Sequence, residues 1–65
     1  MTVSVIAYSH PTADDRAVHD LLWTKAAVVA ARSGREPDTI TAHDARPTDD
    51  GFIEHRALFT VKETR

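Results

Sequence analysis

The stretch TITAHDARPTDDGFIEHRALFTVKE, residues 39–63, decides the fold of this chain. Residues 39 to 46 and 52 to 63 contain many β-branched and aromatic side chains, a composition that predicts two strands. Between them, PTDDG (47–51) combines proline, aspartate and glycine, which favour tight turns. The stretch therefore predicts a β-hairpin with two antiparallel strands.

Two more elements are expected before the hairpin. Residues 2 to 8, TVSVIAY, alternate and predict a strand, which ends before Pro11 because proline has no N–H to donate. A helix should follow, with Thr12 as its N-cap and Asp15 in its first turn, where an acidic side chain stabilises the free amides.

The helix should end near Ser33, because Gly34 can adopt the left-handed conformation that closes many helices. Residues 35 to 38 are expected to form an irregular connection, since Pro37 restricts the residue before it to extended geometry.

These elements predict a single α+β domain over residues 1–65 with the order β-α-β-β. Strands one and two should run parallel, because a helical crossover joins them, and strand three should run antiparallel to strand two. With the longest strand in the centre, the sheet order is 1-3-2. One helix then covers one face of a three-stranded sheet.

The helix is predicted to carry two faces. The core stripe is expected to comprise Ala17, Val18, Leu21, Leu22, Val28 and Val29. On the adjacent arc, Trp23 is a candidate contact anchor beside the small residues Ala27 and Ala30, which permit close approach of a partner. The alternative is that alanine simply favours helix and that Trp23 folds over the edge of the core. Lys25 should project near the middle of the core stripe, with its ammonium group in solvent.

Alternation along the strands predicts which residues share a face. The helix side of strand three should hold Ile53, His55, Ala57, Phe59 and Val61. Pairing Ile40 with Phe59 and Ala42 with Ala57 matches apolar residues and sets Asp44 opposite His55, whereas a slip by one residue sets Asp44 against Glu54.

In the preferred register His43 lies on the outer face of the sheet, opposite Arg56. Tyr8, Leu58 and Arg56 are the candidate contact residues of this face, which a single helix leaves uncovered.

Asp44 and His55 are the one polar pair that the register brings together. A carboxylate beside a histidine is an arrangement used in base catalysis. No serine, cysteine or other nucleophile is expected to complete a triad, so a structural ion pair is favoured. His10 could share a rim with this pair, but no metal-ligand spacing is present and no metal is expected. Phosphate-binding loops, zinc motifs and RNA-stacking aromatic pairs are also missing.

Composition limits the classes of function. A 65-residue monomer buries only about 60% of its unfolded surface, and the chain has no cysteine to form disulfides, so association with other chains is the expected way to complete the core. The net charge of −2 is evenly mixed, and no basic cluster for nucleic acid is present. The longest apolar run, residues 26 to 31, is too short to span a membrane.

Location and source can only be predicted in outline. No signal peptide is recognised at the N-terminus, so a cytoplasmic location is expected. Arginine outnumbers lysine six to two, as is typical of GC-rich genomes such as those of actinobacteria and their phages.

The β-α-β-β order and the chain length resemble the dodecins, which assemble through open three-stranded sheets and can enclose flavins. The resemblance lies in topology, and no site or cofactor is transferred from it. We therefore expect a self-associating binding or assembly module, a homo-oligomer with a further protein partner, rather than an enzyme. The alternatives are a small-molecule-binding oligomer and, third, a minimal hydrolase or lyase that uses His55 and Asp44.

Overall fold

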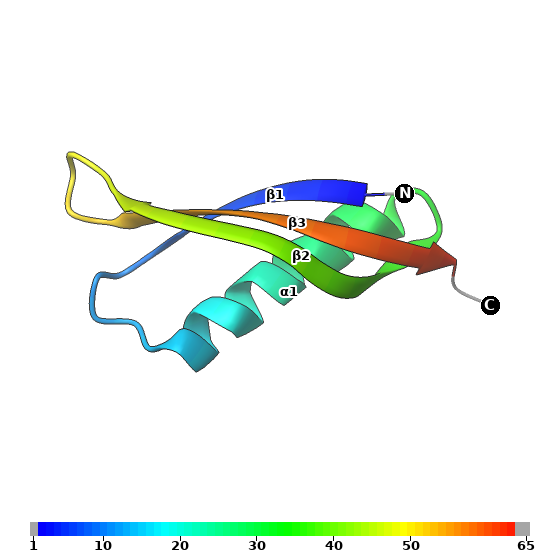
Figure 1. Cartoon of the computed structure of the whole chain (residues 1–65), viewed down its shortest axis with the longest axis horizontal. Helices are drawn as coiled ribbons and strands as arrows, with labels where there is room; N and C mark the ends of the chain where they lie inside the picture. Colours follow the sequence, from blue (N-terminus) through cyan, green and yellow to red (C-terminus); the bar gives the residue numbers. More distant parts are fainter. Residues whose placement is uncertain (1, 64–65) are drawn as a thin grey trace.

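The computed structural model describes residues 2–63 and forms one helix on one face of a three-stranded sheet (Figure 1). The elements are β1 (Thr2–Ser9), α1 (Asp15–Ala31), β2 (Arg35–Pro47) and β3 (Ile53–Glu63). The sheet order is β1-β3-β2, and both outer strands are antiparallel to β3. The predicted element order, sheet order and position of the helix are confirmed.

The core lies between α1 and the sheet. Its helical side chains recur at every fourth position, as Val18, Leu22, Ala26 and Ala30. They face a sheet surface built from Val5, Ala7, Ala57 and Phe59, of which Phe59 is fully buried. The helix side predicted for β3 is therefore confirmed.

The predicted core stripe of the helix is partly wrong. Ala26 and Ala30 lie fully buried in the core, whereas Val28 is 54% exposed and Ala17 is exposed. The buried face is rotated towards the alanines, whose small side chains let the helix approach the sheet closely. Lys25 accordingly does not lie in the middle of the core face and is exposed.

The helix begins later than predicted. Asp14 is the N-cap, and its Oδ1 accepts a hydrogen bond of 2.8 Å from the Ala17 N–H. Thr12, the predicted cap, lies outside the helix, with its Oγ1 2.7 Å from Nδ1 of His10. Gly34 has a φ of 68°, which confirms the left-handed position predicted for it.

Residues 35 to 38 belong to β2 and are not an irregular connection. Arg35, Glu36 and Pro37 are in register with Glu63, Lys62 and Val61. Proline is tolerated here because β2 is an edge strand, which needs hydrogen-bond donors on one side only.

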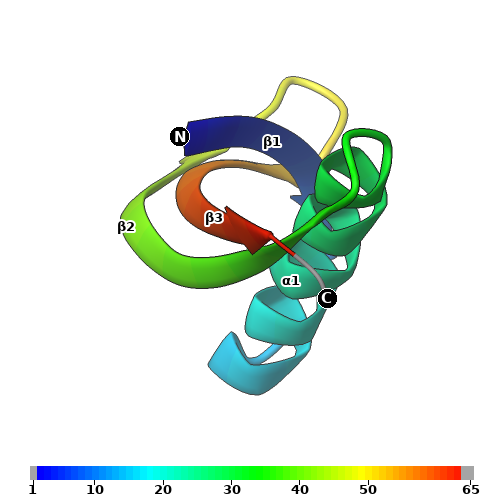
Figure 2. The same ribbon diagram turned by 90° about the vertical axis from the view of Figure 1, so that its right-hand side faces the viewer.

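The register of the hairpin follows neither arrangement considered from the sequence. Ile40 is opposite Phe59 as predicted, but an irregularity between Ile40 and Ala42 then places Ala42 opposite Leu58 and Asp44 opposite Arg56. Thr41 is the extra residue of this β-bulge, and an extra residue reverses the side on which all later side chains lie. A second shift lies between Pro37 and Thr39, and β2 and β3 are strongly curved (Figure 2).

No helix within residues 2–63 is long and apolar enough to cross a membrane.

Candidate functional site

The face of the sheet opposite α1, here called the outer face, carries three rows of side chains in register. The rows are Ser4–Leu58–Ala42, Ile6–Arg56–Asp44 and Tyr8–Glu54–Arg46. No described element covers this face, because the single helix lies on the other side (Figure 1).

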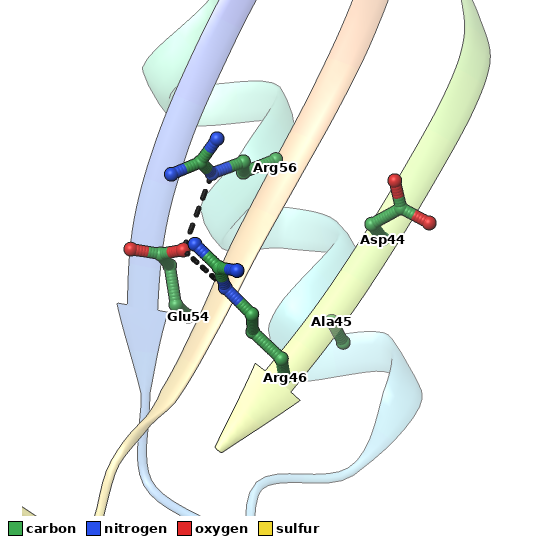
Figure 3. A pocket seen from close by; sticks show the side chains of 5 residues that line it. All are labelled: Asp44, Ala45, Arg46, Glu54 and Arg56. Carbon is green, nitrogen blue, oxygen red and sulfur yellow. Dashed lines mark hydrogen bonds and ion pairs between the residues drawn. The ribbon is translucent and has the colours of Figure 1, made fainter. Parts of the chain in front are cut away.

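A charged cluster occupies one end of the outer face (Figure 3). Glu54 Oε1 accepts hydrogen bonds from Nε of Arg46 at 3.1 Å and from Nε of Arg56 at 3.2 Å. The hydroxyl of Tyr8 donates to Glu54 Oε2 at 3.3 Å. The hydrogen bond from Arg46 is the main cause of a lowered pKa for the Glu54 carboxyl, and the charge of Arg56 adds to it, against the effect of desolvation. Glu54 is therefore a carboxylate at neutral pH.

Asp44 lies on β2, opposite Arg56 on β3 in the register. It nevertheless has no ion pair within residues 2–63. Both arginines turn towards Glu54 instead (Figure 3). Together with Ala45 these residues line an open hollow of about 340 Å³. The hollow thus holds the Asp44 carboxylate, which has no ion pair within residues 2–63, beside the guanidinium groups of Arg46 and Arg56, which both donate to Glu54.

Apolar side chains lie beside the charged cluster. Ile6 is 48% exposed, Tyr8 58% and Leu58 41%. Tyr8, Leu58 and Arg56, the contact residues predicted for this face, therefore all lie on the outer face, where they are exposed.

The three residues predicted to form a contact surface on the helix differ in how far they are exposed. Ala30 is fully buried in the core and so cannot offer its side chain to a partner, which makes that prediction wrong. Trp23 is half-buried, with its ring centroid 5.0 Å from that of Phe59 in an edge-to-face contact. Its Nε1–H donates to Nε2 of His19 at 2.9 Å, so contacts inside the chain account for its position. Ala27 is exposed.

A chain of three polar side chains lies on the helix side of the sheet. Nε2 of His55 is 2.8 Å from Oγ of Ser9, and Nδ1 of His55 is 3.0 Å from Nε2 of His43. His55 is only 5% exposed and Ser9 only 9%. The predicted pairing of Asp44 with His55 is wrong, because the bulge at Thr41 puts His43 on the helix side and Asp44 on the outer face.

The environment of His55 favours its neutral form. Burial lowers its pKa below the usual 6.5, and repulsion from His43 lowers it further. Sequence reasoning missed Ser9 because the strand was expected to end at Tyr8. Extending the alternation of Val5 and Ala7 by two residues would have placed Ser9 on the same side as His55.

A second hollow, of about 170 Å³, lies between α1 and β2. It has an apolar floor and a polar rim, and its lining is Asp15, Val18, His19, Leu22, Ile40 and His43. Within residues 2–63 no three histidine, aspartate or glutamate side chains are arranged to hold a metal ion. His10, which the sequence could place on one rim with Asp44 and His55, is exposed, and its Nδ1 lies 2.7 Å from Oγ1 of Thr12.

No protein-family model, curated protein or solved structure matches this chain. The resemblance to the dodecins therefore stays one of topology.

Proposed function

We propose that this protein is a small binding and assembly module that self-associates through its outer face. The observation that carries the proposal is the exposure of Ile6, Tyr8 and Leu58 on a sheet face that no described element covers. Grouped apolar side chains on an open sheet are typical of surfaces that become buried by association. The small size of the core gives association a thermodynamic benefit, because a chain of this length buries little surface alone.

A second copy of the chain fits this face electrostatically. Arg46 and Arg56 balance Glu54 and Asp44, so two outer faces carry no net charge and do not repel each other. A two-fold axis places residue i of one copy against residue j of the other, and residue j against residue i. Asp44 of one copy could therefore face the guanidinium groups of the other copy, which supplies the partner that Asp44 lacks within the described chain.

The dimensions of the face define how tight the association should be. Three strands about 4.8 Å apart and a few residues long give roughly 15 Å by 20 Å, or about 300 Å². Stable dimers usually bury about 800 Å² on each partner. Contact through this face alone should therefore be weak and reversible, unless other surfaces contribute in a larger assembly.

Sedimentation velocity over a concentration range from about 10 μM to about 1 mM tests the proposal, because weak dimers dissociate in this range. The average mass should rise with concentration. Ile6→Lys should keep the protein monomeric, because it places a charge in the apolar part of the face. Val28→Lys is the matched control: Val28 is 54% exposed on the helix, and the variant should associate like the parent protein. A parent protein that stays monomeric at the highest concentration would refute the proposal.

A small-molecule-binding oligomer is the second candidate, and the hollow beside Asp44 favours it. Its volume of about 340 Å³ is at the lower end of the range for ligand pockets. Terminal N–H groups of Arg46 and Arg56 would suit a small carboxylate or phosphate held between two copies. Native mass spectrometry of the purified oligomer should then show a retained ligand mass, which Arg46→Ala should remove without dissociating the oligomer.

A further inference from the structure

Ser9 stands apart from the other serines within residues 2–63. Its Oγ is 2.8 Å from an imidazole nitrogen of His55, whereas Ser4 is exposed on the outer face and the Ser33 hydroxyl donates to the backbone oxygen of Ala30. A serine hydroxyl in direct contact with a histidine is the first requirement for a nucleophilic serine, because the hydroxyl is weak until a base removes its proton.

The histidine is oriented by a third group. His43 Nε2 lies 3.0 Å from Nδ1 of His55, on the far side of the ring from Ser9. When both rings are neutral, one assignment of the protons makes both hydrogen bonds point the same way, from Ser9 towards His43. The hydroxyl of Ser9 donates to Nε2 of His55, and Nδ1–H of His55 donates to Nε2 of His43. This arrangement leaves His55 Nε2 as an acceptor, ready to act as a base towards Ser9.

We propose that Ser9 is a nucleophilic serine, activated by His55 and positioned through His43, that is acylated by small esters with good leaving groups. Ser9 Oγ bonds to the carbonyl carbon while its proton passes to Nε2 of His55. The bond from that carbon to the leaving oxygen then breaks, and the leaving group takes the proton from His55. Water attacks the acyl group by the same route, releases the carboxylic acid and restores Ser9.

The protonation state of His55 supports this role. Burial and the neighbouring His43 lower the pKa of His55, so the ring is a free base at neutral pH, as a general base must be. Ser9 is the last residue of β1. Its 9% exposure restricts the reaction to small acyl groups.

The site does not depend on self-association, because Ser9 and His55 lie on the helix side and the outer face is on the other side. The two proposals can therefore fail separately. A monomeric protein that is acylated at Ser9 would refute only the first of them.

The experiment treats the whole chain with a fluorophosphonate probe and, separately, with p-nitrophenyl acetate, followed by intact mass measurement and peptide mapping. One label per chain should map to Ser9. His55→Gln should lower the labelling rate about 100-fold or more, since general base catalysis contributes that much. Ser4→Ala and Asp44→Asn should label like the parent protein, because Ser4 and Asp44 lie on the outer face.

Peptide mapping locates the adduct on the parent protein directly, so the assignment to Ser9 does not depend on the folding of any variant. His43→Gln tests positioning: it should shift the pH midpoint of the labelling rate, which a purely structural role would not move. Absence of a stoichiometric adduct on the folded parent protein, or an adduct that maps to another residue, would overturn the proposal.

Discussion

Nε2 of His43 lies 3.0 Å from Nδ1 of His55, and both rings are on the helix side of the sheet. The contact exists because Thr41 is an extra residue in β2, which turns His43 inwards and Asp44 outwards. A buried ring thus has a second imidazole as its neighbour, where regular pairing would have supplied a carboxylate. Burial lowers the pKa of His55 and the charge of His43 adds to this lowering, whereas a carboxylate neighbour would oppose it.

The lowered pKa of His55 predicts that the protein loses stability in mild acid. Below about pH 6.5 the unfolded chain binds a proton at this residue, whereas the folded chain binds it only at a lower pH. The free energy of unfolding should therefore fall as the pH decreases from about 6.5 towards the folded pKa, and this contribution should be constant above about pH 7.5. Thermal unfolding between pH 5 and 8 measures it.

Two variants test whether His55 causes this pH dependence of stability. His55→Gln should flatten the pH profile of the melting temperature, and His10→Gln, at an exposed histidine outside the chain of three, should retain it. A melting temperature that rises as the pH falls towards 5 would contradict the assignment.

The sequence was sufficient for the topology and insufficient for the register. Alternation in residues 2 to 8 and the turn chemistry of residues 47 to 51 required strands and a hairpin, and the crossover rule then left few sheet orders. Nothing in TITA (39–42) marks a bulge, because threonine suits either a regular or a bulged strand position. One unrecognised residue was therefore enough to exchange the positions of His43 and Asp44.

The helix face shows a similar limit. Large apolar side chains suggested a stripe through Val28, but the strongly curved sheet selects the side on which Ala26 and Ala30 allow close approach. Packing distance, which depends on the partner surface, outweighed hydrophobicity there.

The N-cap is testable with two neighbouring substitutions. Asp14→Ala removes the acceptor of the Ala17 N–H and should lower the free energy of unfolding by about 1 kcal/mol. Thr12→Ala removes only an exposed contact with His10 and should cost no more than about 0.5 kcal/mol. Urea unfolding compares the two variants. A larger loss for Thr12→Ala would move the start of the helix back to the position expected from the sequence.

Adjacent residues on β3 should differ sharply in their contribution to stability. Phe59 is fully buried and contacts the ring of Trp23, so Phe59→Ala should cost about 3–5 kcal/mol. A domain of this size has a total stability of only about 3–10 kcal/mol, so the variant should be largely unfolded at room temperature. Leu58, 41% exposed on the outer face, is the control.

Leu58→Ala should keep the far-UV circular dichroism of the parent protein and cost about 1 kcal/mol or less, because its side chain lies on the outer face, outside the core. Similar losses for both variants would contradict the assignment of the two faces.

Deletion of Thr41 gives the sharpest test of the register. Because Thr41 is the extra residue, its removal should let Ala42 follow Ile40 directly and still pair with Leu58, so that His43 keeps its contact with His55. The expected loss is about 1 kcal/mol, for one exposed hydrogen bond from Thr41 Oγ1 to the Leu58 oxygen.

Deletion of Ala45 is the matched control. Ala45 pairs regularly with His55, so its removal forces Arg46 towards the helix side and should destabilise the protein severely. NMR contacts between the rings of His43 and His55, together with the melting temperature, distinguish the outcomes. In a regularly paired hairpin the parent protein would instead lack the contact between the two rings, and deletion of Thr41 would create it by turning His43 to the helix side.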